Sequence, residues 1–431
     1  MRRLYSLLIY LAVPFAFAAV LWRGLRARGY WQALGERFGG GRQNPLACIW
    51  LHAVSLGEMS AAAPLVHALR SRYPQVPLVL TTATPTGRAR ARSLFGDTVD
   101  IRFLPYDLPG AVARFLERVH PRIGLIMETE LWPNLFAACE RRGVPLVLAS
   151  ARLSAKSVSR YRRFGALMRG IFSANVSVAA QTVDDAERFM AIGAPASRTS
   201  VIGNIKFDTD AGGAAPDRGR ELRAGFGASR PLWVAGSTHA GEDEQVLAAH
   251  AKLPADVLLL LAPRHPDRFD AVAELLSRLG LRFIRRSSGA ARIERGVKVV
   301  LVDTVGELAA LYASSDVAFV GGSLVPIGGH NLLEPAALGV PVLTGPSHAN
   351  GREIARLLLQ SGAALQVANA EELSAAVARL LDDPGERRRM GAIGRQTVES
   401  NRGSTQRLLE IIEPVLSDPS TAAAARPSAG C

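Results

Sequence analysis

The most constraining feature of this 431-residue sequence is the repeated alternation of short apolar runs with helical stretches. The runs in the first half are continuously apolar, which is typical of parallel strands covered on both faces. We predict strands there at 48–54, 77–84, 101–106, 123–128, 145–150, 176–181 and 200–205. Helical segments such as 110–119 and 132–142 lie between them. This βαβ rhythm predicts a doubly wound α/β fold.

The rhythm stops at residues 208–231, which are rich in Gly, Ala, Asp and Arg, and then resumes. Such a break indicates a domain boundary, and the chain is too long for one ordinary core. Further strands are predicted near 232–236, 257–262, 297–302, 317–321 and 340–344. We therefore expect two Rossmann-like domains facing a cleft, over 23–207 and 232–415, with 208–231 as the linker. The small, polar residues 416–431 are typical of a disordered tail.

The charge balance restricts the partners of the chain. Lysine and arginine exceed aspartate and glutamate by 13, which favours nucleic acid, acidic lipid surfaces or phosphorylated substrates. Nucleic acid is disfavoured because no helix combines basic with aromatic residues, and aromatic residues make up only 6%. Cys48, Cys139 and Cys431 form no CxxC pair, which favours a reducing compartment over disulfides or zinc. The histidines lack metal-ligand spacing, and we interpret the following as packing or hydrogen-bonding residues: His52, His67 and His239.

Residues 4–22 form an uncharged run of 19 residues, about the length of a membrane-spanning helix. A cleaved signal peptide has a shorter apolar region and a small-residue cleavage site, so the pattern favours an uncleaved anchor over residues 1–22. Five arginines follow the run and two precede it, which favours a cytoplasmic body. Pro14 favours a kinked or shallow helix instead of a straight span.

Ligands of doubly wound sheets bind beyond the carboxyl ends of the strands, so the residues after each predicted strand are the candidates for chemistry. Ser55 and Glu58 follow the first strand. Glu58 is a candidate general base, but the Ser-x-x-Glu spacing also matches a capping box, in which the carboxylate bonds backbone. Spacing alone leaves both roles open.

The fourth predicted strand ends in METELWPN, residues 127–134. Glu128 and Glu130 lie two residues apart, so an extended chain directs both to one side. They are candidates for catalysis, with solvated loop acids as the alternative. Arg88 follows the second strand and Arg152 follows the fifth, each beside hydroxyl side chains suited to phosphate or carboxylate.

In the second half, residues 236–244, 261–269 and 321–335 follow strands. The stretch GGSLVPIGGHNLLEP (321–335) is the strongest signal, because glycines let backbone amides approach a phosphate and the following helix adds its positive end. Glu334 is a candidate ligand of ribose hydroxyls, or an acid favoured by the helix dipole. The P-loop, HExxH and GxSxG motifs are absent from the sequence.

Six motifs together resemble the 3-deoxy-D-manno-octulosonic acid (Kdo) transferases of lipopolysaccharide assembly. They are HAVSLGE (52–58), METELWPN (127–134), GNIKFD (203–208), GSTHAGED (236–243), APRHP (262–266) and GGSLVPIGGHNLLEP (321–335). The resemblance runs from the apolar run to about residue 410, and the combination of SLGE with ELWPN separates this family from other two-domain glycosyltransferases.

The resemblance implies a GT-B-type fold with an N-terminal acceptor domain, a C-terminal donor domain and an anchor in the bacterial inner membrane, with the catalytic body on the cytoplasmic side. It implies CMP-Kdo as donor, a tetraacylated, bis-phosphorylated lipid A precursor as acceptor, inversion at the anomeric carbon, and no cofactor or metal held by the protein. The basic surface then faces anionic lipids of the inner membrane, and nucleic acid is not a partner.

By motif matching, Glu58 is the general base, and Glu128 and Lys206 stabilise the transition state. Further residues fall into two expected groups. The nucleotide-sugar group comprises Pro263, Arg264, Gly306, Glu307, Leu308, Asn331, Leu332, Leu333 and Glu334. The acceptor-binding candidates are Ser55, Arg88, Glu130 and Arg152. Two other functions stay open at this stage: a GT-B transferase or epimerase that uses a UDP-sugar, and a nucleotide-sugar sensor without turnover.

Overall fold

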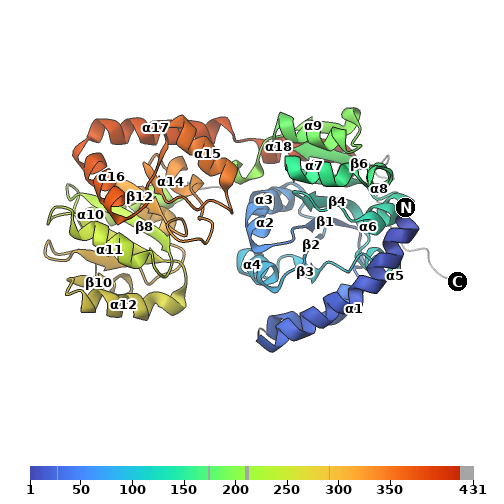
Figure 1. Cartoon of the computed structure of the whole chain (residues 1–431), viewed down its shortest axis with the longest axis horizontal. Helices are drawn as coiled ribbons and strands as arrows, with labels where there is room; N and C mark the ends of the chain where they lie inside the picture. The colour runs from blue at the N-terminus through green and yellow to red at the C-terminus, as the bar shows by residue number, and fades with distance from the viewer. Residues whose placement is uncertain (27, 173–174, 209–212, 291, 418–431) are drawn as a thin grey trace. The chain divides into compact units, whose positions relative to one another are not determined.

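The computed structural model describes the chain except for residues 27, 173–174, 209–212, 291 and 418–431. It divides the chain into two units, each around its own parallel sheet (Figure 1). Unit 1 comprises Met1–Thr209 and Arg402–Cys431, and unit 2 comprises Asp210–Asn401. The two doubly wound α/β units confirm the predicted fold class.

The sheet of unit 1 has the order β3-β2-β1-β4-β5-β6-β7, and its described pairings are parallel. Its strands are β1 (Cys48–His52), β2 (Leu78–Thr82), β3 (Asp100–Phe103), β4 (Pro121–Met127), β5 (Leu146–Ala151), β6 (Val176–Ala180) and β7 (Thr199–Val201). The central strand β1 is buried along its whole length, as its continuous apolar run predicts. Gly124 on β4 leaves the space that the Trp50 ring fills, since a Cβ there would lie 2.8 Å from that ring.

Helices cover both faces of this sheet, and each face has its own apolar core. The α-helices are α1 (Arg2–Arg26), α2 (Leu56–Ala61), α3 (Ala63–Arg72), α4 (Pro85–Phe95), α5 (Pro109–Val119), α6 (Pro133–Arg141), α7 (Ala155–Arg162), α8 (Gly165–Ile171), α9 (Val183–Ala191) and α18 (Ser404–Ser417). The 3-10 turns are η1 (Arg28–Trp31), η2 (Leu34–Phe38), η3 (Ala196–Arg198) and η4 (Ile205–Asp208). α1 is long and apolar enough to cross a membrane.

The sheet of unit 2 has the order β10-β11-β9-β8-β12-β13-β14, again with parallel pairings. Its strands are β8 (Leu232–Thr238), β9 (Leu258–Pro263), β10 (Phe283–Arg285), β11 (Val299–Leu301), β12 (Val317–Val320), β13 (Val342–Thr344) and β14 (Ala364–Gln366). The α-helices are α10 (Ala215–Phe226), α11 (Asp243–Ala251), α12 (Phe269–Arg278), α13 (Leu308–Ser314), α14 (Leu333–Ala337), α15 (Arg352–Ser361), α16 (Ala370–Asp382) and α17 (Pro384–Ser400), with 3-10 turns η5 (Pro266–Arg268) and η6 (Arg286–Ser288).

The sequence pattern missed the outer strands β10 and β14. Each has only three residues, and the side chains of β10 are half-buried, so neither gives a continuous apolar run. The twelve strands that the sequence predicts are present in the structure, with ends that shift by a few residues.

The domain boundaries differ from the predicted ones at both crossings. Much of the expected linker, 208–231, is helix α10, which packs on α13 of unit 2. At the other end α18 packs in unit 1, where Leu408, Leu409 and Ile412 are buried in the core beside β4 and β5. The predicted C-terminal domain, 232–415, therefore includes residues of the other unit. Of the expected tail, 416–431, residues 418–431 lie outside the described residues.

Candidate functional site

Both sheets have a topological switch point, where the strand order reverses direction. In unit 1 the switch lies between β1 and β4, and in unit 2 it lies between β8 and β12. Ligands of such sheets bind beyond the carboxyl ends of the strands at this point. The segments that follow these four strands therefore form one candidate site in each unit.

Glu58 lies in the first turn of α2, directly after β1, and its carboxylate caps the helix. Its Oε2 accepts a hydrogen bond from the Val54 amide at 2.9 Å, and the Ser55 hydroxyl accepts one from the Glu58 amide at 3.3 Å. The bond to the Ser55 hydroxyl is the N-cap bond of a capping box, whereas the carboxylate accepts from the Val54 amide, one residue before the N-cap, instead of from the Ser55 amide. Each carboxylate oxygen has two lone pairs, so the cap leaves Glu58 able to accept a further proton.

Glu128 follows β4 in a left-handed backbone conformation, with φ of 54°. Its carboxylate pairs with two cations from other segments: Arg152 Nε is 2.8 Å from Oε2, and Lys206 Nζ is 3.1 Å from Oε1. Arg152 follows β5 and Lys206 lies on η4, so three separate segments meet at this carboxylate. The positive φ replaces the extended geometry from which the sequence prediction placed Glu128 and Glu130 on one side.

Glu130 is the third carboxylate of this group. Burial, together with the neighbouring charges of Glu58 and Glu128, raises its pKa to about 7. The pKa of Glu58 is also raised, first by burial and then by Glu128, although its bonds with Val54 and Ser55 oppose the shift. The structure thus brings three acids and two cations together at the switch point of unit 1.

In unit 2 a fully buried carboxylate organises the glycine-rich segment after β12. Glu242 has no exposed surface, and its oxygens accept hydrogen bonds from the amides of Gly322 at 2.6 Å, Ser323 at 2.9 Å and Leu324 at 2.8 Å. The amide of His239 donates a fourth bond at 3.1 Å. Three amides of the glycine-rich segment therefore donate to an internal carboxylate, and phosphate binding by the rest of the segment stays a prediction.

Three histidines lie beside this segment. The rings of His239 and His330 stack with centroids 5.0 Å apart, and their Nε2 atoms are 2.8 Å apart. His265 meets His239 edge-on at 5.4 Å. Burial lowers the pKa of His239, and burial with Arg264 and the other two histidines lowers that of His330 to about 4. One neutral ring therefore donates to the other at neutral pH.

A family profile described as 3-deoxy-D-manno-octulosonic-acid transferase (kdotransferase) matches residues 32–209, and one described as glycosyl transferases group 1 matches residues 280–397. The 3-deoxy-D-manno-octulosonic acid transferase of Haemophilus influenzae is 41% identical over 423 residues, which cover 96% of this chain and 99% of the relative. The Bordetella pertussis enzyme is 40% identical over 432 residues, with coverage of 96% and 99%.

The chain belongs to the Kdo transferase family. It is a glycosyltransferase of lipopolysaccharide biosynthesis, as the six sequence motifs predict. The UDP-GlcNAc 2-epimerase of Neisseria meningitidis shares the fold, with a TM-score of 0.57 at 14% identity over 85% of this chain and 99% of that one. That likeness confirms the GT-B-type architecture.

The acceptor-side candidates of this Kdo transferase separate into two groups. Ser55, Glu130 and Arg152 lie with the catalytic candidates at the switch point of unit 1. Arg88 does not join them, because both of its terminal nitrogens bond Glu36, at 3.0 and 3.3 Å, and its guanidinium stacks on Phe103. Its position after a strand is as predicted, but its side chain is buried in an internal ion pair.

The donor-side candidates of the Kdo transferase follow β9, β11 and β12. Arg264 is exposed after β9. Glu307 pairs with Arg218 at 2.9 Å and Arg286 at 3.0 Å, beside Gly306 and Leu308 at the start of α13. Asn331 bonds Glu334 at 3.2 Å. Pro263, Leu332 and Leu333 are buried, and α14 is only five residues long, so the helix dipole expected behind the glycine-rich segment is small.

Glu242 and His330 belong to the candidate site but were not selected from the sequence, although both lie inside recognised motifs. Their position could have identified them, since Glu242 lies in the segment after β8 and His330 in the segment after β12. Of the three histidines that we expected to pack or to form hydrogen bonds, the buried His52 bonds Thr81 and His67 packs against Phe95. The third, His239, stacks on His330 beside the glycine-rich segment. Among the described residues, no group of three or more His, Cys, Asp or Glu side chains is placed to hold a metal ion.

Proposed function

We propose that this Kdo transferase moves Kdo from CMP-Kdo to a hydroxyl of a tetraacylated, bis-phosphorylated lipid A precursor, with inversion and with Glu58 as general base. The observation that carries the proposal is the position of Glu58 at the switch point of unit 1, beside Glu128 and with a raised pKa. A raised pKa makes the ionised carboxylate a stronger base towards a sugar hydroxyl. The same motif matching assigns acceptor binding to unit 1 and donor binding to unit 2.

The reaction needs one proton transfer and one exchange of bonds. Glu58 takes the proton from the acceptor hydroxyl while the hydroxyl oxygen bonds the anomeric carbon of Kdo. The bond from that carbon to the CMP phosphate breaks on the opposite face, which inverts the configuration and releases CMP. The bonds from Val54 and Ser55 fix the carboxylate, so capping and proton transfer are compatible roles.

Glu128 and Lys206 have supporting roles in this proposal. Glu128 forms ion pairs with Arg152 and Lys206, and its negative charge helps to raise the pKa of Glu58. Lys206 brings a cation to the same group, where it can stabilise the Kdo carboxylate or the departing phosphate. In unit 2, Arg264 is an exposed cation for the nucleotide phosphate, and the segments around Glu307 and Glu334 bind cytidine and ribose.

The location proposed for the enzyme follows from α1 and from its substrates. We place it at the cytoplasmic face of the bacterial inner membrane, where an apolar helix and a lipid acceptor bring enzyme and substrate to one surface.

The test is CMP release by the purified protein with the lipid A precursor and CMP-Kdo generated in situ, wild type beside Glu58→Gln. Glutamine keeps an oxygen for the Val54 amide but does not accept the proton, so we expect CMP release to fall by about a hundredfold or more. Mass spectrometry of the acceptor counts the Kdo units added.

Glu372→Gln is the matched control. Glu372 also caps a helix, α16, and accepts the Ala368 amide four residues earlier at 2.8 Å, as Glu58 accepts Val54. We expect this variant to keep full activity. Equal rates for wild type and Glu58→Gln would leave Glu58 with its cap alone. No CMP release from a folded wild type would contradict the proposed substrate pair and direct the assay to UDP-sugars.

A further inference from the structure

The first two thirds of helix α1 contact other elements of unit 1. Near its start the Ser6 hydroxyl donates to Asn134 Oδ1 at 2.9 Å, and in its middle Val13 is buried with Leu108 and Ala111. Further along, the Phe17 ring meets the Phe38 ring of η2 edge-on, with centroids 5.3 Å apart. These contacts span 11 residues, or about 16 Å of helix. A helix held against one domain along this length cannot also cross a hydrocarbon layer about 30 Å thick.

The opposite side of α1 is apolar and exposed. The exposed fraction reaches 78% for Phe15 and 61% for Leu11, and the other members of this stripe are Leu4, Leu8, Trp22 and Leu25. Their spacings of three, four or seven residues keep them on one side of the helix. An exposed apolar stripe of this length on an otherwise basic protein is typical of a helix that lies in the plane of a membrane surface.

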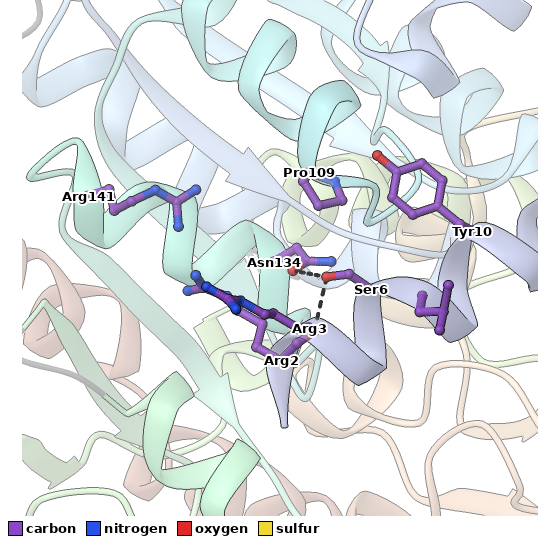
Figure 2. A pocket seen from close by; sticks show the side chains of 8 residues that line it. Arg2, Arg3, Ser6, Tyr10, Pro109, Asn134 and Arg141 are labelled. Atoms are coloured by element: carbon purple, nitrogen blue, oxygen red, sulfur yellow. Dashed lines mark hydrogen bonds between the residues drawn. The ribbon is translucent and has the colours of Figure 1, made fainter.

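A pocket of 420 Å³ lies where the start of α1 meets α5 and α6. Arg2 and Arg3 line it from α1, and Arg141 lines it from the last turn of α6. In Figure 2 the guanidinium groups of Arg2 and Arg3 extend towards the side of the pocket where Arg141 lies. Ser6 and Asn134, joined by their hydrogen bond, supply polar groups beside Arg2 and Arg3.

The charge of this pocket is uncompensated. No carboxylate lines it, and within the part of the chain that the structure describes neither Arg2, Arg3 nor Arg141 forms an ion pair. Guanidinium groups bind phosphate oxygens through paired, charge-assisted hydrogen bonds. The apolar stripe of α1 starts at Leu4, next to these arginines, so a phosphate bound here can belong to a molecule whose acyl chains lie along that stripe.

We propose that α1 lies in the plane of one membrane leaflet and that Arg2, Arg3 and Arg141 bind the phosphate of an anionic phospholipid. The apolar stripe supplies affinity for any bilayer, and the three arginines supply the preference for anionic head groups. None of the three acids described above lines this pocket, and the proposal does not depend on the proposed donor or acceptor.

The first test is flotation of the full chain with vesicles of phosphatidylcholine, with and without about 30 mol% phosphatidylglycerol. We expect wild type to bind both and to prefer the anionic vesicles. Replacing Arg2, Arg3 and Arg141 together by Gln lowers the affinity for anionic vesicles by about tenfold or more and leaves binding to neutral vesicles unchanged.

The matched control removes three exposed arginines of unit 2, Arg278, Arg292 and Arg388, also by Gln. The net charge falls equally in both triple variants, so a specific site requires a larger loss in the first. Equal losses would overturn the lipid site and leave only attraction by net charge.

The second test fixes the position of α1. In a Cys431→Ser background, Arg2→Cys and Arg23→Cys are labelled with a membrane-impermeant maleimide in intact and in lysed spheroplasts. An in-plane helix on the cytoplasmic face is protected at both positions until lysis. Labelling of Arg2→Cys alone in intact spheroplasts would show that α1 crosses the bilayer, and would overturn the proposal.

Discussion

At the scale of single residues, the site of unit 1 concentrates negative charge where burial makes it costly. Glu58, Glu128 and Glu130 lie at one switch point, and only Glu128 has two cations as partners. Burial and the charges of Glu58 and Glu128 raise the pKa of Glu130 to about 7. A proton held there at neutral pH limits the repulsion that Glu58 meets when it ionises.

This shift predicts a pH-dependent effect of Glu130→Gln on stability. The folded-state pKa is above the unfolded one, so ionisation of Glu130 opposes folding. That cost is absent below about pH 4.5 and is complete above about pH 7. We expect Glu130→Gln to leave the unfolding midpoint unchanged at pH 4 and to stabilise the protein by about 1–2 kcal/mol at pH 8.

Thermal unfolding in one detergent at both pH values measures this effect. Glu187→Gln on α9 is the control, since Glu187 is an exposed acid outside the site. It should change the midpoint little at either pH. A stabilisation of Glu130→Gln that is the same at pH 4 and pH 8 would contradict the assigned shift.

At the scale of elements, the glycine-rich segment of unit 2 is held by one side chain. Glu242 accepts four backbone amides, three of them from residues 322–324. We expect Glu242→Ala to lower the free energy of unfolding of unit 2 by about 3–5 kcal/mol, because buried amides lose their acceptor. Affinity for CMP should fall at least tenfold.

Hydrogen exchange of residues 321–329 and calorimetric titration with CMP measure these two effects. Glu244→Ala is the control, since Glu244 accepts one amide, from Gly241, on the exposed side of the same turn. Its expected cost is under about 1 kcal/mol. If both variants exchange and bind alike, Glu242 does not organise this segment.

Some helices and strands could be predicted from the sequence and others could not. The central strands could be predicted because β1 and its neighbours are buried on both faces and have continuous apolar runs. Helix α10 could not, because its Gly, Ala and Arg residues are also typical of a linker. In the structure Gly219 has a packing role, since a Cβ there would lie 2.6 Å from Ala313 on α13. The close approach of α10 depends on residues of α13, and these are not part of the local sequence from which α10 would have to be predicted.

In the candidate site, too, some features follow from the local sequence and others depend on segments that are distant in the chain. Position after a strand selected Glu58, Glu128 and Glu130, and the structure places all three at the switch point of unit 1. It also selected Arg88, whose partner Glu36 lies 52 residues earlier in the chain and has no recognisable motif. Equally, the capping box of Glu58 was visible in the spacing, whereas the positive φ of Glu128 was not. The side chain of Arg88 is directed by its pairing with a distant segment, which a motif does not encode.

At the scale of the whole molecule, the chain leaves unit 1 once and returns to it through α18. Asp208, near the exit, accepts the Gly403 amide at 2.7 Å, near the return. Leu408 and Ile412 of α18 have no exposed surface, and Arg407 donates to the Ile202 carbonyl at 2.8 Å. The last helix therefore completes the core of the unit in which the chain begins.

This closure predicts where damage in α18 appears. Leu408→Ala removes a fully buried side chain, which costs about 2–5 kcal/mol, and the cost belongs to unit 1 although the residue follows unit 2 in the sequence. Hydrogen exchange should accelerate in β4, β5 and α3, which contact α18, and stay unchanged in β8 and β9. Leu380→Ala, an equally buried residue of α16, should give the opposite map. Faster exchange in unit 2 after Leu408→Ala would mean that α18 is stabilised by the unit that precedes it, as the sequence pattern alone suggests.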